Sequence, residues 1–359
     1  MTAAAAAVVT NMNRSLFAAL RDGEYAEACE VLEQATNSAQ VMASVLHVER
    51  PDSTFTRAFG RANNDSMFLL GSISKPIAVA SLLTLMDRGA PRLDDRVNRY
   101  LPAFTGDGRD KTTIQHLLTH VSGLPDQLPE NDSLRSKHAP LSEFVEHAVR
   151  TPLSFAPGAR YQYSSMGILL AARIAEQLSG KEIRTFVDES IFRPLKMTRS
   201  AQGLGRFSMG QLVLNQTESA APEAGGGDPK AKAWDWNSSY WRMLGAPWGG
   251  THCSAPDVAK FLGEFLHQRG AAVRPETARL AVVNRNPPGF TKRGLGFGIG
   301  KSAFSPGCSD QTFGHTGSTG TIAWADPATK TICVVLTSLP ARAVTPHPRD
   351  QAAAKVAGQ

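Results

Sequence analysis

Apolar residues recur at helical spacing in some stretches of the chain and form short runs bounded by turn residues in others. Apolar positions within residues 79–86 lie three and four apart, which predicts a helix that begins at Ser72. Upstream, residues 40–49 and 54–60 are strand-like runs on either side of the turn-forming residues 51–53. This arrangement predicts a β-hairpin before the helix.

Strand patterns return near the C-terminus, after a long helical middle. Helical spacing predicts a helix over residues 13–35, with a break at Gly23 left open, and residues 94–270 are mainly helical with long loops. Residues 217–232, rich in Gly, Pro, Ala and Glu, are expected to bury little surface and to be the least ordered portion. The C-terminal strands are predicted at residues 294–301, 311–315, 319–325 and 331–338. Sheet elements therefore come from both ends of the sequence.

Length and composition predict a folded protein with two lobes. The chain has 359 residues, of which 42% are hydrophobic, enough for a large core and more than a usual single domain holds. The net charge of +6 is spread along the chain without a dense basic run, so nucleic acid is not an expected partner. A mildly basic surface would favour anionic substrates slightly.

The cysteines and histidines do not predict a metal site. The four cysteines lack the paired spacing of zinc ligands and are expected to be reduced, mostly buried thiols: Cys29, Cys253, Cys308 and Cys333. His116 and His120 are four residues apart, but no third histidine or carboxylate is placed to complete a site. Packing or capping roles are expected for both histidines.

The N-terminal segment is a poor match to a signal peptide. It is rich in alanine but has no basic region before a weak apolar stretch. No later segment approaches the roughly 18 uninterrupted apolar residues that a membrane span needs. We therefore expect a cytoplasmic location and no membrane partner, and the sequence does not indicate an oligomeric state.

The tetrapeptide Ser72-Ile73-Ser74-Lys75 combines a nucleophile and a base in one helical turn. Residues three apart share a helical face, so the Lys75 amine can reach the Ser72 hydroxyl. The positive end of a helix dipole stabilises an alkoxide and disfavours an ammonium, which lets lysine accept a proton from serine. An ordinary helix cap followed by a solvated lysine has the same pattern, so the tetrapeptide alone does not decide.

Two distant motifs change that estimate. Tyr163-Ser164-Ser165 lies at the entry to another amphipathic helix, and His315-Thr316-Gly317 lies on a strand that turns at Gly320. In this order the three motifs resemble those of the serine β-lactamase and penicillin-binding protein superfamily: Ser-x-x-Lys, Tyr-x-Asn, and Lys-Thr-Gly or His-Thr-Gly. The spacing is similar to the class C β-lactamase branch, with its D-alanyl-D-alanine carboxypeptidases and family VIII esterases. The resemblance covers residues 40–340.

The resemblance implies an α+β fold of the β-lactamase and transpeptidase type. An antiparallel β-sheet would be flanked by N- and C-terminal helices, with an inserted, mainly helical lobe. Residues 1–90 and 271–359 would form the α/β sheet domain, and residues 91–270 would form the helical lobe. The catalytic cleft would lie between the two.

The resemblance also implies a role for each motif residue. Ser72 would be the nucleophile that forms an acyl-enzyme, and Lys75 would be its base or electrostatic activator. Tyr163 would carry the proton between Ser72, Lys75 and the leaving group. The backbone N–H groups of Ser72 and Ser318 would form the oxyanion hole. No cofactor or metal is implied.

The substrate is less certain than the chemistry, because two motif positions differ from the usual pattern. Ser165 stands where the superfamily usually has asparagine, and a hydroxyl reaches less far than an amide. His315 stands where many relatives have lysine, and neutral histidine carries less positive charge. The shorter hydroxyl at position 165 favours simple small-molecule esters over amides, and the neutral histidine argues against binding of a substrate carboxylate. The predicted substrate-binding residues are Ser165, His315, Thr316, Gly317 and Trp236.

Some alternatives stay open at this level. Trp236 and its aromatic neighbours can be plain lobe packing or can line the acyl pocket, and the pattern favours neither. A carboxylesterase-type serine hydrolase is the preferred function, with a true β-lactamase or D-Ala-D-Ala carboxypeptidase as the alternative. A non-catalytic assembly or binding protein on the same fold is the second alternative. The complete set of Ser72, Lys75 and Tyr163 argues against the latter.

Overall fold

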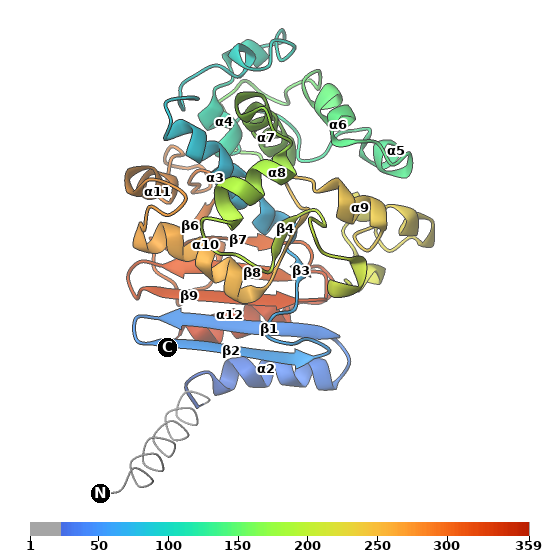
Figure 1. The fold of residues 1–359 in the computed structure, drawn as a ribbon, viewed down its shortest axis with the longest axis vertical. Helices are drawn as coiled ribbons and strands as arrows, with labels where there is room; N and C mark the ends of the chain where they lie inside the picture. The colour runs from blue at the N-terminus through green and yellow to red at the C-terminus, as the bar shows by residue number, and fades with distance from the viewer. Residues whose placement is uncertain (1–22, 359) are drawn as a thin grey trace, which may run out of the picture.

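The computed structural model describes residues 23–358 and contains a six-stranded antiparallel sheet with the strand order β2-β1-β9-β8-β7-β6. The strand β1 from the start of the chain pairs with β9 from its end, which is visible in Figure 1 as blue arrows beside red ones. The predicted hairpin and the predicted union of both chain ends are thereby confirmed. The strands of this sheet are β1 (Ala43–Arg50), β2 (Ser53–Gly60), β6 (Gly298–Ile299), β7 (Phe313–Gly317), β8 (Thr321–Asp326) and β9 (Thr331–Thr337).

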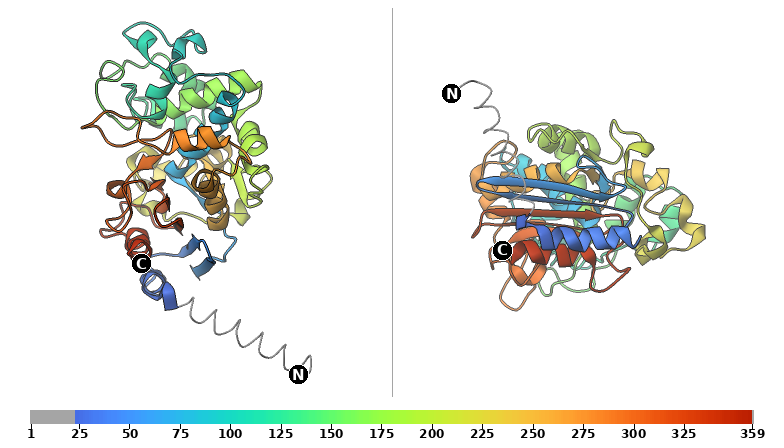
Figure 2. Two further views of the ribbon diagram at one scale, coloured as in Figure 1. Left: turned by 90° about the vertical axis from the view of Figure 1, so that its left-hand side faces the viewer. Right: turned by 90° about the horizontal axis from the view of Figure 1, so that it is seen from below.

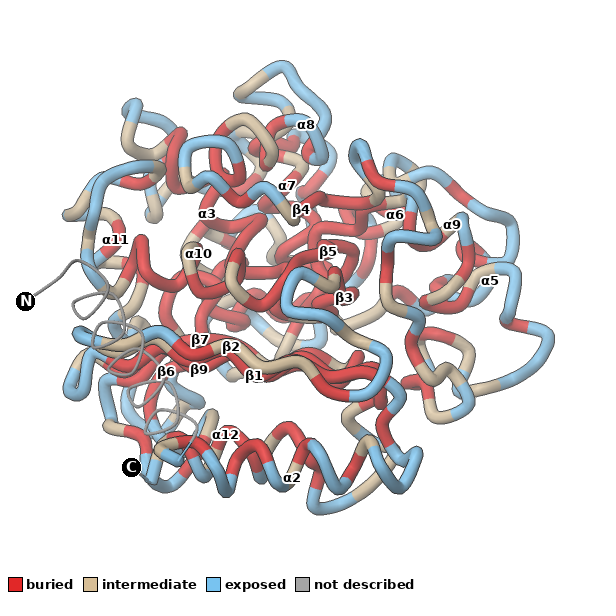
Figure 3. The backbone as a smooth tube through the Cα atoms, turned by 60° about the horizontal axis from the view of Figure 1, so that its bottom comes forward, coloured by how far each residue is buried: buried red, intermediate tan, exposed pale blue. Residues whose placement is uncertain are grey.

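The sheet is covered on both faces, which explains why β9 is a continuous apolar run. Its side chains alternate, so Cys333 and Val335 pack with α2 (Ala26–Asn37) and α12 (Pro348–Ala357). Val334 and Leu336 belong to the core on the opposite face, against which α10 packs. Figure 3 shows α2 and α12 on one side of the sheet and α3 and α10 on the other. Each fully buried valine or leucine contributes about 1.5–3 kcal/mol to folding.

Helices from the two ends of the chain lie side by side on one sheet face. α2 and α12 contact each other, and the right-hand view in Figure 2 shows them side by side. The predicted helix over residues 13–35 corresponds to α2 in its second half, and the part before residue 23 lies outside the described residues. The expected flanking of the sheet by N- and C-terminal helices is therefore confirmed.

The remaining helices form the body above the sheet in Figure 1, with α3 and α7 packed together at its centre. α3 is buried from Ser74 to Leu85, as expected for a helix that is apolar on all sides. α10 lies within the predicted helical lobe of residues 91–270, but it packs on β9, β1 and β8 of the sheet. The boundaries of the lobe stay a prediction. The helices are α3 (Ser74–Met86), α4 (Ile114–Leu118), α5 (Asn131–Ser136), α6 (Leu141–Ala148), α7 (Ser165–Ser179), α8 (Ile183–Val187), α9 (Ser239–Leu244), α10 (Ala255–His267) and α11 (Pro275–Ala281).

A small second sheet lies where the chain enters α3. Its order is β3-β5-β4, with bounds Phe68–Leu69, Thr251–Cys253 and Ser200–Gln202. β3 ends two residues before Gly71, so this sheet fixes the approach of the chain to Ser72. The β-strands of the small sheet thus join three distant parts of the sequence next to the candidate nucleophile.

Two predictions about local structure are wrong. The strand expected over residues 294–301 is reduced to Gly298–Ile299, because Gly296 and Gly300 adopt φ angles of +80° and +88°, outside the extended region. Residues 217–232, expected to be poorly ordered, fold into short 3-10 turns. Buried alanines of this segment, including Ala221 and Ala224, join the same core as the tryptophans of residues 236–248.

Candidate active site

Ser72 lies in a single 3-10 turn, η1 (Gly71–Ile73), that runs directly into α3. The sequence predicted that Ser72 would open the helix, but Ser74 takes the first position of α3 instead. The Ser74 hydroxyl accepts a hydrogen bond from the Thr251 N–H at 3.0 Å, so it joins α3 to β5. Of the two serines in the tetrapeptide, Ser72 is therefore the one whose hydroxyl is placed beside Lys75.

Lys75 holds its amine against the Ser72 hydroxyl in a buried position. The distance from Lys75 Nζ to Ser72 Oγ is 2.9 Å, and a second hydrogen bond of 3.1 Å goes to the carbonyl oxygen of Trp248. Lys75 is 1% exposed. Both of these partners are uncharged oxygens, and burying a charge without a counter-ion is costly. The pair is thus suited to a proton transfer at Ser72.

A loop after β7 approaches the nucleophile turn closely at Gly71. Gly71 has a φ of +56°, and a Cβ atom there would lie 2.9 Å from Thr319 Oγ1 and 3.2 Å from Ser318 N. Thr319 Oγ1 itself donates a hydrogen bond of 2.7 Å to the Leu69 carbonyl. Glycine is therefore required here, because it lets the Ser318 backbone come next to the turn that carries Ser72.

Tyr163 is positioned by the start of α7. Ser164 is the N-cap of this helix, and its hydroxyl accepts a hydrogen bond of 2.9 Å from the Gly167 N–H. Tyr163 therefore precedes the helix and its side chain turns into the site. Its ring centroid lies 4.6 Å from that of His120 and 4.7 Å from Lys75 Nζ. The phenol ring is thus held between the His120 imidazole and the Lys75 amine.

His315 is neutral, and its tautomer is set by the backbone. Nδ1 lies 2.6 Å from the Thr316 carbonyl oxygen, so Nδ1 carries the hydrogen and Nε2 is an acceptor. Nε2 lies 3.5 Å from the Tyr163 hydroxyl and 3.4 Å from Arg293 Nη1. Burial, aided by Arg293 and Lys75, holds the pKa of His315 well below 6.5. His315 can therefore accept a hydrogen bond from Tyr163 but does not supply a positive charge.

Ser165 is hydrogen-bonded to the carboxylate of Asp126. Its hydroxyl donates a hydrogen bond of 2.6 Å to Asp126 Oδ1, and its backbone N–H donates to the same oxygen at 2.9 Å. The sequence placed Ser165 among the substrate-binding residues. Its hydroxyl hydrogen is already used, so Ser165 contributes an oxygen to the wall of the site and Asp126 contributes a carboxylate.

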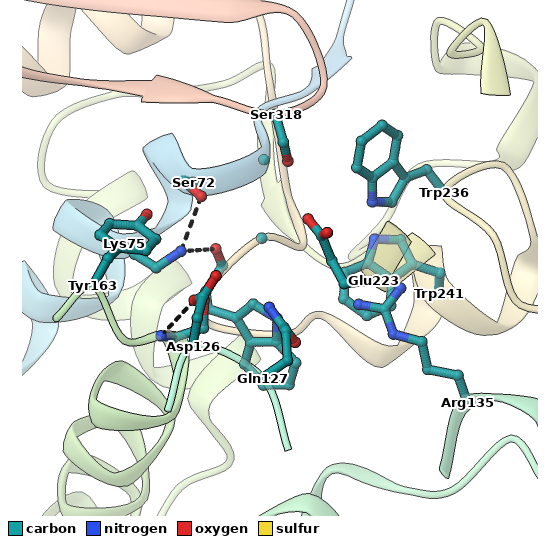
Figure 4. A pocket seen from close by; sticks show the side chains of 14 residues that line it. Ser72, Lys75, Asp126, Gln127, Arg135, Tyr163, Glu223, Trp236, Trp241 and Ser318 are labelled. Carbon is teal, nitrogen blue, oxygen red and sulfur yellow. Dashed lines mark hydrogen bonds between the residues drawn. The ribbon is translucent and has the colours of Figure 1, made fainter. Parts of the chain in front are cut away.

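A cavity of about 130 Å³ opens beside Ser72 and Lys75. Figure 4 shows Tyr163 on one side of Ser72 and Arg135, Glu223 and Trp241 on the other. Trp236 is 3% exposed, belongs to the hydrophobic core and also lines this cavity. Trp236 therefore packs in the core and borders this cavity, and its contact with an acyl group stays a prediction.

The predicted substrate-binding residues do not all face this cavity. Ser165, Trp236 and Ser318 line it, together with Ser72 and Tyr163. His315 and Thr316 line a separate, larger cavity of about 520 Å³, which also includes Arg293. Gly317 ends β7, and its carbonyl accepts a hydrogen bond from the Gly320 N–H at 3.1 Å. Gly317 lines neither of the two cavities.

Several residues of the site were not singled out from the sequence. Asp126, Arg135 and Glu223 line the first cavity, and Arg293 donates hydrogen bonds of 3.1 and 2.8 Å to the Tyr161 hydroxyl. Asp126 ends a stretch that resembles the family, which is a weak signal. The other three residues lie in loops or short helices without a motif.

His116 in α4 and His120, two residues after this helix, have capping and packing roles. The Thr113 hydroxyl accepts from the His116 N–H and His116 Nδ1 accepts from the Thr113 N–H, both at 3.3 Å. This reciprocal pair is a capping box, as expected. His120 Nδ1 accepts a hydrogen bond of 3.2 Å from the Ser164 N–H, so His120 supports the residue that caps α7.

Residues 23–358 have neither the side-chain grouping of a metal site nor a helix of the membrane-spanning kind. In this range, no three His, Cys, Asp or Glu side chains gather as a metal site would need. The same residues include no helix with the length and apolar character required to cross a bilayer. All four cysteines are buried, as predicted. The cytoplasmic location stays a prediction.

Comparison with known protein families places this site in a wider group. The family model described as Beta-lactamase matches residues 31–358 of the chain. The chain belongs to the beta-lactamase family. The resemblance inferred from the three motifs is therefore confirmed, and the sheet with its covering helices is the fold of this family.

Relatives within the beta-lactamase family carry more than one kind of name. Esterase EstB of Burkholderia gladioli is 34% identical over 191 residues, which cover 46% of this chain and 48% of the esterase. Penicillin-binding protein 4* of Bacillus subtilis (strain 168) is 33% identical over 45% of this chain and 38% of its own length. The chain thus matches about half the length of these two relatives or less. The solved structure of EstCE1, described as a hydrolase with promiscuous acyltransferase activity, superposes with a TM-score of 0.77 at 21% identity, covering 94% of this chain and 100% of EstCE1.

Proposed function

We propose that this chain is a serine hydrolase that cleaves small carboxylic esters through an acyl-enzyme on Ser72. The observation that carries the proposal is the 2.9 Å contact between Ser72 Oγ and the buried Lys75 Nζ, whose other hydrogen bond goes to a carbonyl. A buried lysine beside a serine hydroxyl adds little to the stability of the fold, but it is suited to activating a nucleophile. Membership of the beta-lactamase family and the similarity to an esterase support it.

In the first half-reaction, Ser72 Oγ bonds to the ester carbonyl carbon as its proton moves to Lys75 Nζ. The backbone N–H groups of Ser72 and Ser318 would hold the resulting oxyanion. The bond from carbon to the alcohol oxygen then breaks, and that oxygen takes a proton from Tyr163, which is restored from Lys75. Water releases the acid by the reverse sequence, with the proton of water passing back to Ser72.

The proton path favours a leaving group on the Tyr163 side of Ser72. His315 Nε2 is an acceptor 3.5 Å from the Tyr163 hydroxyl, so it can hold that hydroxyl in place between turnovers. Because His315 is neutral, it adds no positive charge that would oppose proton transfer to Lys75. His315 therefore acts on orientation in this proposal, and Tyr163 transfers the proton.

Esters are favoured over amides and β-lactams by the state of Ser165. Its hydroxyl and its N–H both donate to Asp126, so position 165 offers no donor to a substrate carbonyl. An amide requires more exact positioning and a stronger acid than an ester, because its leaving group is poorer. True β-lactamase or D-Ala-D-Ala carboxypeptidase activity is the alternative that the test below addresses.

The test combines labelling and turnover. Wild-type protein, Ser72→Ala and the matched neighbour Ser74→Ala are incubated with a fluorophosphonate, and intact mass is measured. We expect one adduct on wild type and Ser74→Ala and none on Ser72→Ala, with hydrolysis of p-nitrophenyl acetate following the same pattern. Absence of an adduct on wild type would refute the proposal. A higher kcat/KM for a chromogenic cephalosporin than for the ester would make β-lactamase the better description.

A further inference from the structure

Arg135 on α5 is a buried arginine whose guanidinium reaches the catalytic cavity. It is 1% exposed, and it lines the same cavity as Ser72 and Lys75. Its Nε donates a hydrogen bond of 3.1 Å to Asn131 Oδ1, while its Nη1 has no hydrogen-bond partner within residues 23–358. An unpaired donor of this kind is expensive to bury, so it points to a partner that is absent when the cavity is empty.

A second unpaired donor and an acceptor lie beside the first. The guanidinium carbon of Arg135 lies 3.8 Å from the ring centroid of Trp241, and Trp241 Nε1 also lacks a partner among the described residues. Trp241 and Glu223 both line the cavity, and Figure 4 shows the Glu223 side chain on the same side of Ser72 as Arg135. The end of the cavity therefore offers two N–H donors and one carboxylate acceptor.

Asn131 connects the Arg135 side chain to the backbone of Glu223. Its Oδ1 accepts from Arg135, and its Nδ2 donates a hydrogen bond of 3.2 Å to the Glu223 backbone carbonyl. Asn131 thus ties α5 to the 3-10 turn at Pro222–Ala224. Burial lowers the pKa of Arg135 to about 10, and Glu223 opposes this effect, so Arg135 stays charged near pH 7. The arrangement is fixed before a substrate binds.

We propose that Arg135, Trp241 and Glu223 form a subsite that selects acyl chains ending in a neutral carboxamide. The carbonyl oxygen of the amide would accept from Arg135 Nη1 and Trp241 Nε1, and its NH₂ group would donate to Glu223. A carboxylate would satisfy the two donors but would face the negative charge of Glu223. This inference rests on the proposed esterase function.

The position of the subsite assigns it to the acyl chain. Tyr163 protonates the leaving alcohol in the proposed mechanism, so the alcohol lies on the Tyr163 side of Ser72. Figure 4 shows Arg135 and Trp241 on the opposite side of Ser72. The acyl chain therefore runs toward Arg135, and the cavity of about 130 Å³ limits it to a short chain.

The test compares three methyl esters of similar size by pH-stat. Methyl succinamate ends in a carboxamide, methyl 4-methylpentanoate is its apolar isostere, and monomethyl succinate ends in a carboxylate. For wild type we expect kcat/KM of methyl succinamate to exceed that of the isostere by about tenfold or more, as for a hydrogen bond to a charged group. Monomethyl succinate should be the poorest of the three.

Variants separate recognition from folding. Arg135→Met should remove the preference for methyl succinamate, and Glu223→Gln should reduce it while improving monomethyl succinate. Lys137→Met, an exposed cation on the same turn, should leave the ratio of the two kcat/KM values unchanged. Melting temperature and the rate of fluorophosphonate labelling check that Arg135→Met is folded, and Glu223→Gln gives an independent test because Glu223 is only half-buried.

Failure of the subsite and failure of the proposed function give different results. Ser72-dependent hydrolysis of all three esters with equal kcat/KM for methyl succinamate and its isostere would keep the function and overturn the subsite. A preference for monomethyl succinate over methyl succinamate would overturn the choice of a neutral amide. Absence of both labelling and hydrolysis in wild type would overturn the function and the inference together.

Discussion

At the residue scale, the chemistry of the site depends on where the protons of Lys75, Tyr163 and His315 lie. Lys75 makes hydrogen bonds to a hydroxyl and a carbonyl. The Nδ1–H of neutral His315 donates a hydrogen bond to the Thr316 carbonyl. In the proposed mechanism the Tyr163 hydroxyl passes a proton from Lys75 to the leaving alcohol. The phenol is therefore the residue whose loss should separate binding from chemistry.

Tyr163→Phe should lower kcat for p-nitrophenyl acetate by on the order of 10²-fold or more, as for a lost general acid–base. The ring that packs on His120 is retained, so KM and melting temperature should change little. The matched control is Tyr161→Phe, which removes a hydroxyl bonded to Arg293 and should cost much less activity. Unchanged kcat in Tyr163→Phe would remove this tyrosine from the mechanism.

At the element scale, the site depends on contact between the turn η1 and the loop after β7. These two segments come from opposite ends of the chain, and Gly71 is the point where they meet. Thr319 and Thr321 strengthen the contact, because their hydroxyls donate to the carbonyls of Leu69 and Leu70 at 2.7 Å. Any side chain at position 71 would separate Ser72 from Ser318.

Gly71→Ala should therefore lose most activity, on the order of 10²-fold, because reacting groups would move apart. The control is Gly180→Ala, at the C-cap of α7, which has a φ of +70° and no atom within 4 Å of its added Cβ. Both variants carry the strain of a left-handed alanine, about 1–2 kcal/mol of unfolding free energy. Equal kcat values in the two variants would show that the close contact at Gly71 has no role.

At the scale of the whole molecule, several histidines in different parts of the fold are buried in the neutral form. Burial is the main cause in each case, and it lowers the pKa of His252 to about 3 and that of His347 to about 4. The pKa values of His120 and His315 are also held well below 6.5. These groups resist protonation in the folded chain but not in the unfolded chain.

The stability of the fold should therefore fall as the pH drops below 6.5. Above that pH neither state protonates these histidines, and below it the unfolded chain binds protons that the folded chain does not. Each such histidine removes about 1.4 kcal/mol of unfolding free energy per pH unit, down to its folded-state pKa. Urea unfolding at pH 7.5, 6.0 and 5.0 measures this, and His252→Asn should show a shallower slope. An unfolding free energy that does not change between pH 7 and 5 would contradict the prediction.

Much of the fold was predictable, because its signals are local or periodic. The hairpin of β1 and β2 and the strands β7, β8 and β9 followed from short strand-like runs and the turn residues that bound them. The two wrong predictions have different causes. Glycines broke an extended run at residues 294–301, and small alanines found a place in the core at residues 217–232, which depends on the tryptophans that surround them.

The sequence by itself determined that the Lys75 amine can reach the Ser72 hydroxyl, because residues three apart share a helical face. It also determined the family, through three motifs in order. Tertiary structure alone decided three features of the site. The Ser165 hydroxyl donates a hydrogen bond to Asp126, His315 presents an acceptor to Tyr163, and Arg135 reaches the cavity. These contacts join segments that no local period relates, so only the packing of the complete chain could bring them together.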